Sequence, residues 1–344
     1  EHANSARLAA EAARRHANAP TRIPDYILKN YPNPLQEENY ISGKACDHYN
    51  RFREDFDIAK SLGHNAHRFS IEWSRVEPEE GKFNEKEIGH YREVIKALRE
   101  RGMEPFVTLW HWTLPLWIAK KGGWTSRETV DHFIRYSEKV VKEFQGEVRF
   151  WITLNEPSLW SGNAYLLGIL PPQKSNIFYT ARAYWNLHRA HCGVYDIFKK
   201  IDKEFQIGVA ESMEWYGFWS LRILANYFRN FFFIHTVIDK IDFIGVNYYK
   251  AVGVGKKNMS DMEWTIYPRG LYFILLRVGR FFRKPLFITE NGIADTRDEK
   301  RAEFIRPYIY WMHEAIRQGA DIRGYFHWSL LDNFEWDSGF WPRF

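Results

Sequence analysis

The sequence predicts an α/β protein of the (β/α)8 class, a TIM barrel, in which seven of the eight strands are recognisable. Three observations predict it. Short apolar runs rich in β-forming residues recur about every 35 to 60 residues, the spacing of a strand, a loop, a helix and a return loop. The stretches between them have helical periodicity, and no Ser/Gly linker divides the 344 residues. We therefore expect one domain over residues 1–344, with residues 1–41 a helical and loop segment that leads into the barrel.

The predicted strands are almost continuously apolar, whereas a half-exposed strand alternates between apolar and polar residues. Continuous hydrophobicity is typical of parallel strands that are covered on both faces. The seven predicted strands are Asn65–Ile71, Glu104–Trp110, Val148–Leu154, Gln206–Glu211, Ile241–Asn247, Pro285–Glu290 and Ile322–Trp328.

The helices are predicted from apolar residues that recur with a period near 3.6. In Lys86–Arg101 they form one stripe that includes Ile88 and Ile95, with charged residues opposite. Gly102 follows this helix and Gly319 follows the last one, as expected of helix ends. The other predicted helices are Ala3–Asn18, Arg127–Phe144, Asn176–Lys200, Leu221–Ile234, Pro268–Phe281 and Glu299–Gln318.

Composition excludes several classes of protein. With 45% hydrophobic and 26% charged residues the chain has enough apolar surface for a core, which excludes intrinsic disorder. No apolar run approaches the ~20 residues of a membrane span. The net charge of +5 is weak support for nucleic-acid binding. The first residues lack a secretory signal, so we expect a cytoplasmic protein with neither a membrane nor a nucleic acid as partner.

Cofactor and metal sites are not indicated. The two cysteines, Cys46 and Cys192, exclude a disulfide framework and a thiolate cluster. His188 and His191 share a helix face without further ligands, so we interpret them as ordinary helix residues. An open doubly wound sheet is the alternative fold, but it requires a Gly-rich phosphate loop, and residues 253–257 lack its spacing.

Polar residues follow the predicted strands, at the end where a parallel barrel carries its functional groups. Two carboxylates stand out: Glu156 after the third predicted strand and Glu290 at the end of the sixth. Two acids that face each other across a pocket are the groups required to cleave a glycosidic bond, one as proton donor and one ionised. Arg68 is a plausible charge partner for one of them.

Six segments around these residues resemble glycoside hydrolase family 1, the β-glucosidase and β-galactosidase family of (β/α)8 barrels. They occur in the family's order, and the resemblance extends from about residue 42 to residue 344. The segments are Arg68–Pro78 (RFSIEWSRVEP), Thr108–Trp112 (TLWHW), Thr153–Pro157 (TLNEP), Gly245–Tyr249 (GVNYY), Ile288–Gly292 (ITENG) and His327–Trp336 (HWSLLDNFEW).

The resemblance implies a retaining β-glycosidase that acts on the non-reducing end of small glycosides and oligosaccharides. Glu156 would be the general acid/base, and Glu290 the nucleophile that forms a covalent glycosyl-enzyme. Trp264 would be a platform for the leaving group, and Phe344 an aromatic residue at the pocket edge. The other residues implied to bind substrate or to orient the two acids are Arg68, His111, Trp112, Asn155, Asn247, Tyr249, Trp328, Glu335 and Trp336.

The chain also departs from the family pattern. Nothing before Ser42 resembles the family's first strand, which bears a sugar-binding Gln, and the family's last helix would follow Phe344. The chain as given is therefore expected to be a barrel short of these two elements, by truncation or because this chain does not include them. If they are truly absent, we expect open strand edges beside the family's second and eighth strands. This leaves a second hypothesis, a sugar-binding barrel that has lost turnover. The segment Phe228–Phe233 is expected to be a helix packed on the barrel, and a contact in an oligomer is left open.

Overall fold

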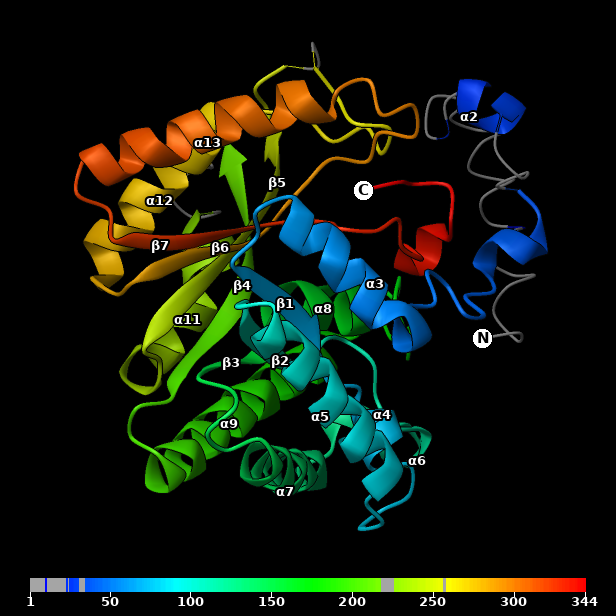
Figure 1. The fold of residues 1–344 in the computed structure, drawn as a ribbon, viewed down its shortest axis with the longest axis vertical. Coiled ribbons are helices and arrows are strands. Elements are labelled where there is room, and N and C mark those ends of the chain that lie inside the picture. The colour runs from blue at the N-terminus through cyan, green and yellow to red at the C-terminus, as the bar shows by residue number, and fades with distance from the viewer. Residues whose placement is uncertain (1–9, 11–22, 24, 31–34, 218–225, 256–257) are drawn as a thin grey trace.

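The protein contains a nearly closed barrel of seven parallel strands in the order β1-β2-β3-β4-β5-β6-β7, which confirms the predicted fold class (Figure 1). This computed structural model describes residues 10, 23, 25–30, 35–217, 226–255 and 258–344. The strands are β1 (Ala66–Ser70), β2 (Glu104–Trp110), β3 (Phe150–Asn155), β4 (Gln206–Tyr216), β5 (Phe243–Val252), β6 (Leu286–Asn291) and β7 (Ile322–His327).

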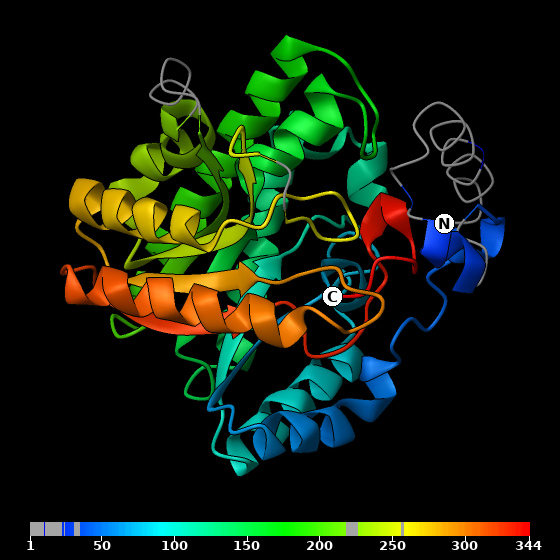
Figure 2. The ribbon, with the colours of Figure 1, turned by 90° about the horizontal axis from the view of Figure 1, so that it is seen from above.

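Helices surround the strands, and each of the longer ones after β1 connects one strand to the next (Figures 1 and 2). The α-helices are α2 (Asp25–Asn30), α3 (His48–Ser61), α4 (Trp73–Val76), α5 (Glu85–Glu100), α6 (Leu116–Lys120), α7 (Glu128–Glu143), α8 (Pro157–Ser161), α9 (Ile177–Ile201), α11 (Phe232–Val237), α12 (Pro268–Phe282) and α13 (Arg301–Arg317). The short 3-10 or π segments are η2 (Glu37–Tyr40), η3 (Gly123–Thr125), η4 (Gly162–Leu166), η5 (Asn226–Phe231), η6 (Ile238–Lys240) and η7 (Trp336–Ser338).

The predicted helix boundaries are confirmed to within two residues where a capping residue marks the helix end, as in α5. The Asn84 carboxamide oxygen accepts hydrogen bonds from the amides of Lys86 and Glu87, which fixes the start of α5. Side-chain caps of this kind stabilise a helix by about 1 kcal/mol. The helix ends just before Gly102, whose φ of 66° suits a residue without a Cβ atom.

One helix and two strands differ from the expectation. The helix α3 was not predicted, because its inward face is short: Phe52, Phe56 and Ala59 are its only buried apolar residues. The strands β4 and β5 continue five residues past their predicted ends, where Trp215 pairs with Ala251. The predicted helix 3–18 lies outside the described residues apart from residue 10, as does the first part of the predicted helix 221–234.

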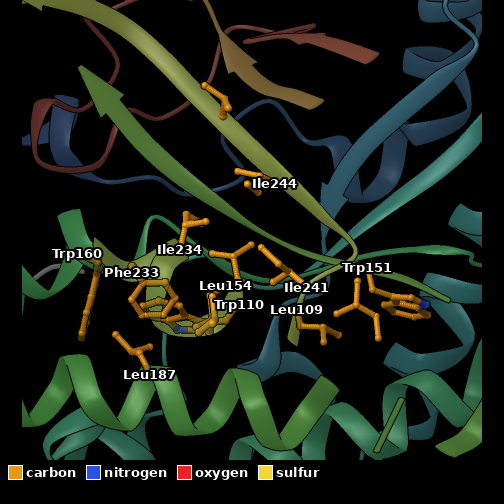
Figure 3. Packing of buried hydrophobic residues seen from close by; sticks show 14 of the residues in the cluster. Leu109, Trp110, Trp151, Leu154, Trp160, Leu187, Phe233, Ile234, Ile241 and Ile244 are labelled. Carbon is orange, nitrogen blue, oxygen red and sulfur yellow. The ribbon is translucent and has the colours of Figure 1, made fainter. Parts of the chain in front are cut away.

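The core has two layers. The barrel interior is filled by Phe106, Ile152, Ala210, Phe243 and Phe287. A larger layer lies between the strands and the surrounding helices, and Figure 3 shows part of it beside α9. Large side chains in both layers fix the register of every strand, because a slip by one residue would exchange inward and outward side chains.

The outermost strands of the sheet are less buried than the central ones. All residues of β6 are buried, whereas β1 and β7 contain only partly buried and exposed residues. Among the described residues β1 pairs with β2 alone and β7 pairs with β6 alone.

His191 has a structural role in the core. His191 is fully buried, and its ring nitrogens contact the Thr153 hydroxyl at 2.7 Å and the Lys240 carbonyl at 2.8 Å. Burial lowers the pKa of His191 to about 4, so the ring is neutral at neutral pH. Within the described part of the chain no group of three or more potential ligands is placed to hold a metal ion.

The segment Phe228–Phe233 packs largely as expected. Phe231 and Phe233 are buried, and Phe231 contacts the rings of Phe281 and Phe282 at the end of α12. Phe228 remains 60% exposed. A contact in an oligomer remains a prediction. Of the helices that the structure describes, none combines the length and the apolar character needed to cross a bilayer.

Candidate active site

The polar residues after the strands meet at one end of the barrel. Asn155, Glu156, Asn247 and Glu290 are each at most 5% exposed although all four are polar. Asn155 and Glu156 lie at the end of β3, Glu290 lies near the end of β6, and Asn247 lies in the middle of β5. These strands are neighbours through β4 in the sheet. Burial of so many polar groups is stable only if they bind one another, and they do.

The Glu290 carboxylate is held at both oxygens. Arg68 of β1 donates from Nη1 to Oε1 at 2.6 Å, and the Tyr249 hydroxyl donates to Oε2 at 2.9 Å. The Arg68 and Glu290 side chains are each 6% exposed, so little water screens this ion pair. Burial raises the pKa of Tyr249 well above its ordinary value, which keeps the hydroxyl a donor. Both oxygens of the carboxylate thus have a hydrogen-bond donor, and one of the donors is a cation that balances its charge.

Glu156 is in a different environment. Burial, and then the charge of Glu290, raises the pKa of Glu156 to about 8, so this carboxyl group is protonated at neutral pH. Its Oε1 atom accepts a hydrogen bond from Asn247 Nδ2 at 2.9 Å. Its backbone has φ 48° and ψ 51°, a left-handed conformation uncommon for a residue with a side chain. Pro157 follows at the first position of α8 and sets the chain direction.

Asn155 connects the two acids. Its Oδ1 atom accepts from Arg68 Nη2 at 2.7 Å and from Asn247 Nδ2 at 3.2 Å, and its Nδ2 lies 3.1 Å from His111 Nε2. Burial lowers the pKa of His111 to about 4, so the ring is neutral and its Nε2 can accept this bond. The network gives the two carboxyl groups different hydrogen-bond partners and fixed orientations.

Aromatic rings form two walls of the site. On one side Trp112 and Trp336 have centroids 4.7 Å apart, and His111 lies 5.9 Å from Trp328. Flat apolar faces of this kind suit the C–H-rich faces of sugar rings.

On the other side Trp264 contacts Tyr249 at 5.5 Å and Phe344 at 5.9 Å. Phe344, the last residue of the chain, is buried, and Figure 1 shows this end of the chain close to the strand ends.

Glu335 is half-buried beside these rings. Asn333 Nδ2 donates to its Oε2 atom at 3.0 Å. Burial, with a smaller contribution from the charge of Glu290, raises the pKa of Glu335 to about 7. The loop after Glu335 is fastened by buried Asn39, whose Nδ2 donates to the Ser338 carbonyl at 3.0 Å and whose Oδ1 accepts from the Phe340 amide at 3.0 Å.

All thirteen residues proposed from the sequence are therefore in one site, and sequence reasoning missed several that support it. Thr108 accepts from Arg68 Nε at 3.2 Å, and Thr289 donates to Asn247 Oδ1 at 2.6 Å. Both threonines lie inside the segments that resemble the family. A hydroxyl in a buried strand needs a hydrogen-bond partner, so the sequence could have indicated both residues. Asn39, almost 300 residues from the loop that it holds, had no local signal.

Gly292 has a steric role that predicts a mutational effect. A Cβ atom at this position would lie 1.7 Å from the carbonyl oxygen of Trp328. Gly292→Ala must therefore move the Trp328 backbone and its ring. Because a shift of about 1 Å can cost up to ~100-fold in rate, we expect kcat/KM for a β-glycoside to fall by about tenfold or more.

Gly279→Ala in α12 is the matched control, because its Cβ atom would meet neighbours only at 3.8 Å. This control should keep full activity. Unchanged steady-state kinetics of Gly292→Ala would contradict the assigned packing of Trp328.

Comparison with known proteins agrees with this geometry. The sequence model of Glycosyl hydrolase family 1 matches residues 10–220 and 254–344. The chain is 34% identical to Beta-glucosidase A of Thermotoga maritima over 361 aligned positions, which cover 87% of this chain and 81% of that protein. It is 29% identical to a Beta-galactosidase of Sulfolobus acidocaldarius, with 86% and 78% covered.

Solved structures agree as well. A beta-glycosidase from Pyrococcus horikoshii superimposes with a TM-score of 0.84 at 37% identity, over 89% of this chain and 80% of that one. The Thermotoga maritima beta-glucosidase in complex with deoxynojirimycin gives a TM-score of 0.82 at 34% identity, over 87% and 81%. With a family match over most of its length, a barrel of the same architecture and a buried pair of acids at the strand ends, the chain belongs to glycosyl hydrolase family 1 and is a β-glycosidase.

Proposed function

We propose that this chain hydrolyses the terminal non-reducing β-linked sugar of small β-glucosides or β-galactosides, with Glu290 as nucleophile and Glu156 as acid/base. The observation that carries these roles is the difference between the two carboxyl groups. Glu290 has Arg68 and Tyr249 as donors at its two oxygens, whereas Glu156 is buried with a raised pKa. One acid is thus prepared to attack and the other to donate a proton.

In the first step Glu290 attacks the anomeric carbon, and the glycosidic C–O bond breaks. Glu156 transfers its proton to the departing oxygen, which leaves as an alcohol. The product of this step is a glycosyl ester of Glu290. Arg68 holds the nucleophile in place, and Asn155 in turn orients Arg68 by accepting a hydrogen bond from its Nη2 atom at 2.7 Å.

In the second step a water molecule attacks the same carbon from the face that the leaving group vacated. The ester no longer has the negative charge of Glu290, so the pKa of Glu156 falls and its carboxylate can take the proton of the water. Two inversions at one carbon give net retention of configuration.

The surrounding side chains suit a hydroxylated ring. We propose that His111, Asn155 and Glu335 bind sugar hydroxyls and that Trp328 stacks on the ring. Trp264 and Phe344, on the opposite wall, would contact the leaving group. Glucose and galactose are proposed as the sugars because the relatives are named for them.

The proposal is tested by the stereochemistry of the product. ¹H NMR of a β-glucoside digest at early times should show the β-anomer first, followed by slow mutarotation. A 2-fluoro glycoside with a good leaving group should trap the ester on the peptide that contains Glu290, detected by mass spectrometry. Immediate appearance of the α-anomer, or a label on another residue, would contradict the mechanism.

The pH dependence follows from Glu156. Its pKa of about 8 lies above the ordinary value, and the protonated form is the active one in the first step. For a substrate with a poor leaving group, kcat/KM should therefore hold at neutral pH and decline tenfold per pH unit above a midpoint near 8. A decline that is complete below pH 6 would show that Glu156 does not supply the proton.

A further inference from the structure

Behind the proposed acid/base lies a second buried carboxylate, Glu211 of β4, which is 0% exposed. Its neighbour Ala210 belongs to the barrel interior, so the alternation of a strand directs Glu211 outward, between β4 and the surrounding helices. It is therefore not part of the sugar pocket. A buried carboxyl group is costly unless its oxygens are bound, so its contacts indicate what it does.

Glu211 contacts the turn that contains Glu156. The Ser158 hydroxyl donates to Glu211 Oε2 at 2.9 Å, and the Ser212 amide donates to Oε1 at 3.1 Å. The amide of Glu156 donates to the Ala210 carbonyl at 2.7 Å. Two consecutive residues of β4 thus hold both ends of the three-residue segment that begins with Glu156. This segment contains the left-handed residue, whose backbone conformation must be maintained by such contacts.

The charged and titratable groups around Glu211 come from several elements. Glu156 lies on the barrel side, and Tyr184 of α9 and Arg229 of η5 lie on the helix side, each close enough to interact electrostatically with Glu211. Arg229 also donates to the Ser212 carbonyl at 3.3 Å and lies 3.9 Å from Glu214.

Lys250 of β5 pairs with Glu214 at 3.2 Å. Burial raises the pKa of Glu211 to about 7, so its charge changes near neutrality, and this charge adds to that of Glu290 in raising the pKa of Glu156.

We propose that Glu211 is a positioning residue for proton transfer: it holds the Glu156 turn through Ser158, and its negative charge helps Glu156 to retain its proton. This inference rests on the acid/base role proposed for Glu156. It assigns two separable effects, a mechanical one through the Ser158 hydrogen bond and an electrostatic one through the carboxylate.

Glu211→Gln tests the electrostatic effect, because the amide keeps an acceptor for Ser158 but has no charge. The alkaline midpoint of kcat/KM for an alkyl β-glucoside should move to lower pH by about 0.5 unit or more. Glu211→Asp, which restores a carboxylate, should return the midpoint toward the parent value. The exposed Glu204→Gln, in the loop before β4, is the control and should leave the midpoint unchanged.

Ser158→Ala tests the mechanical effect, because it removes the hydrogen bond and keeps the charge. For an alkyl glucoside, whose leaving group needs the proton, kcat/KM should fall by about three- to tenfold. For a dinitrophenyl glucoside, whose leaving group does not need it, kcat/KM should stay within about twofold. This variant also keeps the inference falsifiable if Glu211→Gln does not fold.

The results that would contradict the role of Glu211 differ from the result that would contradict the role of Glu156. If Glu211→Gln lowers only the melting temperature and leaves the alkaline midpoint in place, Glu211 is merely structural and the inference is wrong. Equal losses with both glucosides in Ser158→Ala would also overturn it. An alkaline decline that survives in Glu156→Ala would instead contradict the role proposed for Glu156 itself.

Discussion

Glu290→Gln is expected to lower kcat/KM for an aryl β-glucoside by about ten-thousand-fold or more, because the variant has no nucleophile to form the ester. The amide is nearly isosteric, so it can still accept a hydrogen bond from Arg68, whose side chain is 6% exposed. The fold should therefore survive, and residual turnover can be measured with a substrate that has a good leaving group. Loss of the ester signal in the trapping experiment should accompany the loss of rate.

The same variant should lower the pKa of Glu156, since the charge of Glu290 is one cause of its elevation. Titration of the ¹³C-labelled Glu156 carboxyl group by NMR measures this directly. Glu299→Gln, an exposed carboxylate after the same strand, is the matched control and should keep full activity. Turnover that is retained in Glu290→Gln would exclude the catalytic role of Glu290. A barrel that only binds sugar would show no turnover in the parent chain and little change in sugar binding in either variant.

Glu156→Ala is expected to divide substrates by leaving group. For alkyl glucosides kcat/KM should fall by about 100- to 10,000-fold, the usual contribution of a positioned proton donor. For dinitrophenyl glucosides kcat/KM should change little, but kcat should fall, because the glycosyl-enzyme accumulates without a base to activate water. Stopped-flow measurements should show a burst of dinitrophenolate followed by slow turnover.

Azide provides the control for this variant. As an anion it needs no general base, so it should restore kcat and give a β-glycosyl azide as product. The parent enzyme should be insensitive to azide at the same concentration. An equal fall of kcat/KM for all leaving groups would contradict the assignment of Glu156 as proton donor.

Sequence periodicity predicted the barrel because the segments taken as strands are rich in apolar residues and most of the long helices have one apolar stripe. The helix α3 was not predicted because Phe52, Phe56 and Ala59 are its only buried apolar residues. Three residues are too few to form a clear apolar stripe. The extensions of β4 and β5 were not predicted because they contain polar residues such as Glu214 and Lys250. Pairing between the two strands, as of Trp215 with Ala251, makes these segments strands, not the propensities of their residues.

The active site also has features that the sequence determines and features that only the tertiary structure decides. The sequence by itself determined which residues follow the strands, and thereby that Glu156, Glu290 and their aromatic neighbours meet at one end of the barrel, because parallel strands place their carboxyl ends together.

Only the tertiary structure decided how the acids differ. The cause is the asymmetric environment: Arg68 and Tyr249 reach Glu290, whereas Glu156 is buried against Asn247 with Glu211 behind it. Protonation depends on distances between charges and on exclusion of water, and both arise from contacts between segments up to about two hundred residues apart in the chain.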